Sequence, residues 1–255
     1  MSGLICAGDV YLDLYVNSAL TGMVGPINAT KFAISPGTAE KIDRISYLRD
    51  TFGQALDSVV FPGVASLSID SDDAGAEVLQ YAILGTLSDV STAQGQISAG
   101  TPESVTARVG YKVKLANRKV ASVVVKDSTN TTTYSGTTDY TLYDASAGLL
   151  HIPTTSTIVD GSTLNVSYNY GAISGKQIIA ATKTEVRCYV RLDGKNLSNQ
   201  KKVVITVPEA VLTPSGELDV AGKKFVTFSL SGSLVTQAGQ SGPFIYREIT
   251  ETAYA

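Results

Sequence analysis

The chain has 255 residues, of which 44% are hydrophobic and 17% charged, so it can bury a core beneath a lightly charged surface. Its formal net charge of -3 gives no global positive field that would hold nucleic acid. Trp is absent, Tyr outnumbers Phe by 13 to 6, and Gly is frequent with 23 residues, a profile that favours β structure with many turns.

The N-terminal stretch MSGLICAGDVYLDL predicts no signal peptide, because it has neither a basic start nor an adequate apolar run before Asp9. No apolar run approaches the roughly 20 residues that span a bilayer, so we expect no membrane insertion and folding in a cytosol. Cys6 and Cys188 form no motif. We expect both to be free, small, buried hydrophobic residues, which suits a reducing compartment.

The first part of the chain alternates strands with turns. Alternation predicts a strand over 4–16, a turn-rich link over 17–26 and a second strand over about 29–35. A charged hairpin then covers 38–62, with its tip near 49–53. Its apolar side chains alternate with charged ones, and so long a ribbon cannot bury both faces within one small domain. We therefore expect the hairpin to pair with other chains.

One helix is predicted, after a polar strand over 64–70. The segment DDAGAEVLQYAILG has an N-cap candidate in Asp72 or Asp73, and Gly85 suits the position that ends the helix. The face expected to be buried consists of Val78, Leu79, Ala82 and Ile83. A single amphipathic helix beside many strands normally covers one open face or end of a β-sandwich.

The rest of the chain predicts an inserted module and then a return to the main domain. The stretch 88–102 is small and polar and reads as a loop, whereas 103–171 has short strands with turn signals about every ten residues. Three further strand segments follow, with a turn at 193–196 and an apolar patch near the C-terminus. The predicted domains are 1–102 and 172–255 for the main domain and 103–171 for an inserted Ig-like or other small β module.

The sequence offers little catalytic chemistry. His151 is the only histidine, and it lies in an apolar strand context that predicts a structural role. No G-x-S-x-G, P-loop or G-x-G-x-x-G motif occurs. The acids at 70, 72 and 73 lack the loop of a calcium site, and nothing near the pairs Asp9 with Asp13 and Glu185 with Asp193 would raise a carboxyl pKa. We expect no enzyme activity, no metal and no cofactor.

Three segments carry a resemblance to a known family. They are FAISPGTAEKIDRIS, LRDTFGQALDSVVFPG, and LSIDSDD followed by AEVLQYAILG. In this order they resemble the major tail tube proteins of long-tailed, non-contractile (siphovirus-type) bacteriophages. The resemblance covers mainly 1–90 and 175–250, and 103–171 looks like a small β module that some of these proteins carry outside the tube.

The resemblance implies a mainly β, tail-tube-type β-sandwich or barrel with one flanking helix, a long extended hairpin and the inserted β module. Six copies would form a ring whose strands join in one continuous β-barrel. Stacked rings would form a hollow tube in the virion tail, assembled in the host cytoplasm, through which the genome passes. Partner proteins would be the tape measure, distal tail and terminator proteins.

The resemblance also implies roles for individual residues. The hairpin would reach neighbouring subunits through Arg44, Tyr47, Arg49, Phe52 and Gln54, so Phe52→Ala or Arg49→Glu should block polymerisation and leave a folded monomer. A polar or acidic lumen would let DNA pass without specific binding. Its candidates are Asp43, Asp50, Asp57 and Glu185, each of which could equally be a solvated or interfacial carboxylate.

Two alternatives stay open at this point. The first is the inner tube of a contractile tail, which has the same chemistry inside a sheath. The second is a carbohydrate-binding or adhesin-like β protein, which predicts a monomer with a sugar-stacking site among five tyrosines, namely Tyr134, Tyr140, Tyr143, Tyr168 and Tyr170.

Overall fold

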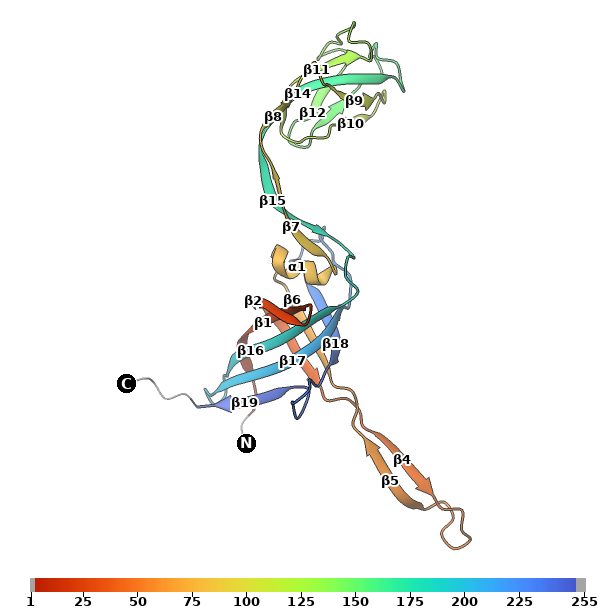
Figure 1. Cartoon of the computed structure of the whole chain (residues 1–255), viewed down its shortest axis with the longest axis vertical. Helices are drawn as coiled ribbons and strands as arrows, with labels where there is room; N and C mark the ends of the chain where they lie inside the picture. The colour runs from red at the N-terminus through yellow and green to blue at the C-terminus, as the bar shows by residue number, and fades with distance from the viewer. Residues whose placement is uncertain (1–2, 251–255) are drawn as a thin grey trace, which may run out of the picture. The chain divides into compact units, whose positions relative to one another are not determined.

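The chain is mainly β, with several antiparallel sheets and one helix, as the sequence predicts (Figure 1). The computed structural model describes residues 3–250. It divides into two compact units: unit 1 combines the segments up to Leu87 and from Ile178 onward, and unit 2 is Ser88–Gln177. Unit 2 thus extends beyond the predicted module 103–171 on both sides.

Unit 1 is built on one eight-stranded antiparallel sheet in the order β2-β1-β16-β17-β18-β6-β3, with β19 paired to β17. The sheet is open, and β2 and β3 are its end strands. The helix α1 spans Ala76–Ala82. The strands of this sheet are β1 (Cys6–Val16), β2 (Ala19–Ile27), β3 (Ala29–Ser35), β6 (Ser66–Ser71), β16 (Val186–Asn196), β17 (Lys202–Pro214), β18 (Phe228–Leu234) and β19 (Ile245–Ile249).

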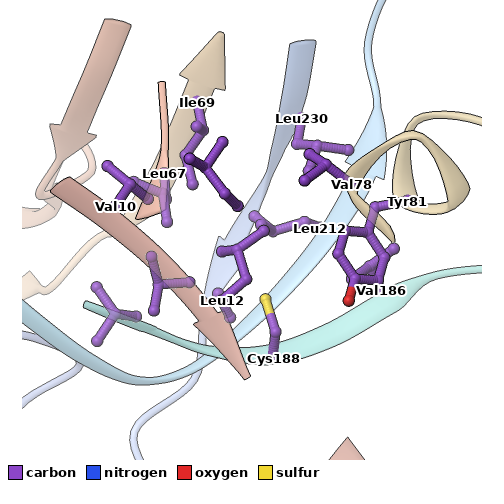
Figure 2. Packing of buried hydrophobic residues seen from close by; sticks show 14 of the residues in the cluster. Val10, Leu12, Leu67, Ile69, Val78, Tyr81, Val186, Cys188, Leu212 and Leu230 are labelled. Carbon is purple, nitrogen blue, oxygen red and sulfur yellow. The ribbon is translucent and has the colours of Figure 1, made fainter. Parts of the chain in front are cut away.

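Alternation in β6, β16 and β18 gives the sheet of unit 1 an apolar face toward the core and a more polar opposite face. Every second residue is buried from Leu67 to Ser71 in β6 and from Val186 to Leu192 in β16, and Phe228, Leu230 and Leu234 are buried in β18, as the period of a strand requires. The buried side chains of all these strands meet α1 in one core, shown in Figure 2. Full burial of one such aliphatic or aromatic side chain contributes about 1.5–3 kcal/mol. Fully buried members include Val10, Leu12, Leu67, Ile69, Tyr81, Val190, Leu212 and Leu230.

The N-terminus of α1 differs from the prediction. Neither Asp72 nor Asp73 caps the helix, because Gly75 is the N-cap residue and no side chain bonds to the first turn. Asp73 instead accepts the N–H of Gly75 at 3.1 Å in the preceding loop. Asp72 accepts a bond of 2.6 Å from the side chain of Asn28, which ties the loop to the segment between β2 and β3.

The buried face and the end of α1 also differ from the prediction. The helix buries Val78, Tyr81 and Ala82, whereas Ile83 is the C-cap. The left-handed residue after the helix is Leu84, with φ of 49°, so Gly85 does not supply the left-handed turn. Gly85 is needed for space, because a Cβ there would lie 2.4 Å from the side chain of Ile178.

The two cysteines are both free, but only one is buried. Cys188 points into the core, and burial raises the pKa of its thiol to about 12, so it stays protonated and unreactive. Cys6 lies at the exposed start of β1. The expectation that both are buried is therefore wrong for Cys6, because the residues of β1 are exposed up to Asp9 and burial begins only at Val10.

Two segments predicted as turns are strands. The link over 17–26 contains most of β2, which tolerates its glycines and Pro26 because it is an end strand with two bulges. The predicted turn at 193–196 belongs to β16. Gly194 is there because it lies opposite Gly8, where a Cβ on Gly8 would come within 2.5 Å of the Cα of Gly194. Glycine in both places allows close strand approach instead of a bend.

Unit 2 has its own core between two small sheets, β10-β13-β12 and β11-β14-β8, with β9 paired to β14. The chain enters and leaves through the paired strands β7 (Thr86–Thr92) and β15 (Ile173–Ile179). The predicted loop over 88–102 is thus partly strand. The strands of unit 2 are β8 (Gly95–Ile97), β9 (Glu103–Thr106), β10 (Lys112–Lys114), β11 (Val120–Asp127), β12 (Thr141–Asp144), β13 (Leu149–His151) and β14 (Thr163–Tyr170).

A buried carboxylate holds two loops of unit 2 together. Asp139 accepts the N–H of Ser135 at 2.8 Å and both the N–H (3.0 Å) and the hydroxyl (2.8 Å) of Thr157. These donors favour the ionised form and lower the pKa of Asp139 below its ordinary value of 3.8. A lowered pKa in the folded state means that the stabilisation is present above the unfolded pKa and is lost as the pH falls through the folded pKa.

We therefore expect unit 2 to lose stability below about pH 4, and Asp139→Asn to weaken this dependence and destabilise the unit at neutral pH. Thermal unfolding of both proteins at pH 7 and pH 3 measures the effect, and hydrogen exchange at neutral pH should locate the loosening of the variant at 135–139 and 157. A variant with the wild-type pH dependence would contradict the assignment.

Candidate assembly surface

The segment between β3 and β6 is a hairpin of two strands, β4 (Glu40–Ile45) and β5 (Ala55–Phe61), that form a sheet of their own. Every residue of both strands is exposed. An isolated two-stranded hairpin is at best marginally stable in water, so these side chains need a partner. The exposed large apolar residues of the hairpin and its base are Ile42, Ile45, Tyr47, Leu48, Phe52, Leu56, Val59, Val60, Phe61 and Val64.

The strand register separates the hairpin into two faces. Ile42 lies opposite Val59, and Glu40 lies opposite Phe61, so their side chains share one face. We call Ile42, Val59 and Phe61 the apolar face. The same face also carries Glu40 and the cross-strand pair of Arg44 with Asp57, whereas the opposite face carries Lys41 opposite Val60 and Asp43 opposite Ser58. The three apolar side chains therefore lie together between charged residues, and a partner that buries them must also match those charges.

The polar face carries a small network around Asp43. Lys41 Nζ lies 3.0 Å from Asp43 Oδ1. A hydrogen bond from Ser58 and the nearby Lys41 together lower the pKa of Asp43. The carboxylate is therefore fully ionised at neutral pH, and the cost of removing it from water keeps this face exposed or opposite a partner with donors.

The tip of the hairpin is an ordered turn, although almost all of its side chains are exposed. Ser46 is fully buried; its N–H donates to Gln54 O at 2.8 Å and its O accepts from Gly53 at 2.9 Å. Its hydroxyl lies 2.7 Å from that of Thr51. This network fixes the loop so that the rings of Tyr47 and Phe52 meet edge to face at 5.8 Å, while 81% of the first and 70% of the second stay exposed.

Two glycines form the base of the hairpin, where its two arms pass closely. A Cβ on Gly37, whose φ is +81°, would lie 2.4 Å from Val64 O. A Cβ on Gly63 would lie 2.3 Å from Thr38 O. The pairs Pro36-Gly37 and Pro62-Gly63 at the two ends of the hairpin therefore allow this backbone contact.

The predicted interface residues all lie on the exposed hairpin: Arg44 in β4, and Tyr47, Arg49, Phe52 and Gln54 in the tip. The structure also brings three of the four lumen candidates together there. Asp43 and Asp57 lie on the strands, and Asp50 lies 3.7 Å from Arg49 Nε at the tip. Val59, Phe61 and Val64 are also exposed on the hairpin and its base but are not among the predicted interface residues, although they are apolar and lie in or beside a segment expected to contact other chains.

Glu185, the fourth lumen candidate, lies on a different element. It precedes β16 on the side of the sheet opposite the core, which we call the outer face. Arg187 Nη2 lies 3.3 Å from Glu185 Oε1, and Nη1 bonds to Glu209. The four acids therefore form no single cluster, and Glu185 is neutralised by a neighbour.

The outer face of the sheet is hydrophilic throughout the strands with clear alternation. Several charged groups on it are paired: Arg191 Nη2 lies 2.8 Å and Lys202 Nζ 3.5 Å from the carboxylate of Asp193. Serines alternate with core residues in the two strands nearest β3. The serines on the outer face of β6 and β18 are Ser66, Ser68, Ser229, Ser231 and Ser233. The pattern SLSIDS and SLSGSL carried this signal in the sequence, but it was not used to define a surface.

The described residues contain no cluster of three or more His, Cys, Asp or Glu side chains that could hold a metal ion. Within residues 3–250, no helix is long and apolar enough to cross a membrane. His151 lies in β13, and its Nδ1 is 3.3 Å from Tyr111 O. Tyr140 and Tyr168 are core residues of unit 2 and cannot stack on a ligand, whereas Tyr143 is exposed beneath Lys112 Nζ, 3.7 Å from the ring centre.

Comparison with models of protein families gives a match over most of the chain. A family model described as "Protein of unknown function UCP028589" matches residues 4–243, which include both units. No curated protein matches the chain.

Proposed function

The chain belongs to this UCP028589 family, whose description assigns no activity, and from its own surfaces we propose that it is the structural subunit of a phage tail tube. In this proposal six copies form a ring, and rings stack into a hollow tube that conducts the genome into the host. The protein acts by assembling, and DNA passes its lumen without specific binding.

The hairpin is the observation that carries the proposal. The hairpin and its base expose many large apolar side chains, and large exposed apolar patches on a soluble protein mark contact with another chain. The tip adds aromatic and arginine side chains, the residue types enriched at the centre of interfaces. Because the tip is held by the bonds of Ser46, little conformational entropy is lost when it docks. We propose that the hairpin docks on neighbouring copies.

The open sheet supports ring formation. End strands with unpaired backbone groups are templates for pairing, and proteins that remain monomeric usually blunt them. β2 is blunted by two bulges and Pro26, whereas β3 pairs regularly with β6 from Lys31 to Ser35. We propose that β3 accepts a strand of the neighbouring subunit, which removes the exposed end and extends the sheet around the ring.

The outer face of the sheet then faces the lumen in our proposal. It has no apolar stripe, and its arginines are held in ion pairs, so a passing duplex would meet few unpaired cations. Of the acidic candidates only Glu185 belongs to this face. We propose that Asp43, Asp50 and Asp57 belong to the hairpin contacts instead.

Negative-stain microscopy of the purified chain at rising concentration tests the proposal. Rings or hollow tubes with a regular axial repeat are the expected result. A monodisperse monomer at the highest concentration reached, confirmed by sedimentation, would contradict self-assembly. A tube with a surrounding sheath in particles of the parent phage would favour the inner tube of a contractile tail over the non-contractile type.

A further inference from the structure

A polar pocket of unit 1 lies apart from the hairpin. It measures about 480 Å³, and it is lined by the turn 17–18, the uncharged residues Tyr15 and Gln237, and the charged residues Glu185, Arg187 and Glu209. We propose that this pocket receives the hairpin tip of a second copy of the chain, in the next ring of the stack. The inference rests on the proposed function, because it names the surface on which the hairpin docks.

The hairpin leaves the sheet of unit 1 at one end of the strands. Ser66, the first residue of β6, lies in a row with three partners across the sheet, Ser233, Val211 and Arg187. Because neighbouring strands in this sheet are antiparallel, β6 runs opposite to β16. The hairpin arm that precedes Ser66 therefore points along β16 toward Asn196, and the hairpin projects from this end (Figure 1).

The pocket lies at the opposite end of the strands. β1 is antiparallel to β16 and ends at Val16, so the turn 17–18 lies beside the start of β16. Glu185 directly precedes that start. In a stack of rings that all point the same way, the hairpin end of one ring faces the pocket end of the next. A head-to-tail contact of this kind needs two different, complementary surfaces on the same chain.

The lining of the pocket carries a surplus of one negative charge. Arg187 Nη2 lies 3.3 Å from Glu185 Oε1, and Nη1 bonds to Glu209, so two carboxylates share one guanidinium. Arg187 Nε also bonds to Oε1 of Glu185, at 3.4 Å. The other oxygen of Glu185, Oε2, accepts none of the described bonds and is left for a donor of a partner.

The charges that adjoin the lining along the chain balance one another. Lys183 lies two residues before Glu185, and the buried Asp13 lies two residues before Tyr15, so one charge of each sign is present. The segment 215–227, at the same end of the sheet, carries two acids and two lysines. The surplus of the lining therefore remains, and it favours a partner with a positive group.

Hydrogen bonds hold the pocket in shape before a partner binds. Gln237 Nε2 donates to Tyr15 Oη at 2.8 Å and to Glu209 at 3.2 Å. Tyr15 Oη in turn donates to Pro208 O at 3.0 Å. Leu20 is the cross-strand partner of Tyr15 and is 48% exposed, so it adds an apolar side chain on the same face. A fixed site of this kind lowers the entropy cost of docking.

The hairpin tip carries the matching groups. The Arg49 side chain is 96% exposed, and its contact of 3.7 Å with Asp50 lies in water, where such a pair is worth little. The guanidinium can therefore turn to Glu185, while Asp50 meets donors of the pocket such as the amide of Asn17. The two aromatic rings of the tip can pack on Leu20. Glu185 then lies in the contact between rings, at the end of the lumen face.

Exchange of the two charges tests the contact, with the pelleted fraction of the full chain as the measure of assembly. Arg49→Glu and Glu185→Arg should each lower this fraction by at least about tenfold, because like charges then meet. The double variant should restore it to within about twofold of the wild type. Asp9→Arg is the matched control, since it makes the same change on the outer face at the hairpin end of the sheet. Combined with Arg49→Glu, it should restore nothing.

Disulfide cross-linking locates the contact without changing these charges. In a Cys6→Ser background, in which the remaining Cys188 is buried, Leu48→Cys at the tip is assembled with tagged chains that carry Ser18→Cys. Oxidation should join the two in a mixed dimer, identified by its mass. Leu197→Cys, exposed at the hairpin end of the sheet, is the control partner and should give at least about fivefold less mixed dimer.

The outcomes separate this inference from the proposed function. Tubes of the wild-type chain without rescue by the charge exchange would overturn the inference alone, as would preferential cross-linking to Leu197→Cys. A wild-type chain that forms neither rings nor tubes would overturn both. Unaltered thermal unfolding of each variant shows that a loss of assembly reflects the contact and not the fold.

Discussion

Replacing Val59 by aspartate should abolish assembly into rings or tubes while leaving the free energy of unfolding of the monomer within about 0.5 kcal/mol of the wild-type value. Val59 lies at the centre of the apolar face, opposite Ile42 and half exposed in the single chain. The monomer therefore loses little packing from the change. In the assembly, a new carboxylate would have to be buried beside Asp57 on the same face, which costs several kcal/mol per copy.

Val60→Asp is the matched control, because it makes the same change one residue further along the same strand and on the opposite face. The new carboxylate would lie opposite Lys41 and stay in water. Sedimentation velocity and negative-stain microscopy of both variants measure assembly. Loss in Val59→Asp alone identifies the apolar face as the buried one, and loss in both means that the hairpin is covered on both faces. Normal tubes from Val59→Asp would contradict a role of the hairpin in assembly.

Variants of the hairpin tip should also lose assembly while the single chain stays folded, because the changed side chains are exposed in the monomer. Phe52→Ala removes a ring that is mostly exposed in the monomer, and Arg49→Glu reverses a charge whose side chain is almost fully exposed. Both changes are nearly neutral for folding of the single chain, apart from the edge contact of Phe52 with Tyr47, worth about 0.5–1.5 kcal/mol. Their effect on assembly tests the tip separately from the apolar face.

The sequence predicted those parts of the fold whose signal is local. β3 occupies the predicted range, since the Pro36-Gly37 signal ends it, and the hairpin follows from alternating charged and apolar residues with a glycine near the tip. The helix was also predicted correctly, because the helical spacing of its apolar residues is a local signal. The buried face was predicted partly wrongly, because the helix turns Val78, Tyr81 and Ala82 (positions i, i+3 and i+4) toward the core instead of the neighbouring face with Leu79 and Ile83.

Features set by contacts between distant segments could not be predicted. Gly194 looked like a turn residue because its role depends on Gly8, which is far away in the chain. Ser46 looked like any polar tip residue, yet it is fully buried because the loop folds back on it. Two adjoining pockets of unit 2 are lined together by the 117–119 turn, the 146–149 segment and the ends of β7 and β15, so no local pattern could have indicated them.

A second large effect, on the stability of unit 1, is expected from a substitution at Gly232. This residue lies in β18, the strand that connects the hairpin to the rest of unit 1. The hairpin lies between β3 and β6, and in the sheet order these two strands join the others through β18. At Gly232 the strands approach so closely that a Cβ would meet Val211 O at 1.9 Å, with Leu212 Cα at 2.9 Å. Neither contact can be relieved by a side-chain rotation, because both atoms belong to the backbone of β17.

Gly232→Ala should therefore lower the free energy of unfolding of unit 1 by about 3 kcal/mol, since β18 must move away from β17 and break part of their ladder. Gly175→Ala in strand β15 of unit 2 is the control for the substitution itself; its Cβ would meet nothing within 4 Å, and the free energy of unfolding of unit 1 should change by less than about 0.5 kcal/mol. Urea unfolding with hydrogen exchange across β17 and β18 measures both. Equal stabilities of the two variants would show that the strands can separate freely at this point. Gly232→Ala leaves the exposed apolar side chains of the hairpin in place. If the variant is less stable and also forms no tubes, assembly needs the hairpin anchored to an intact sheet.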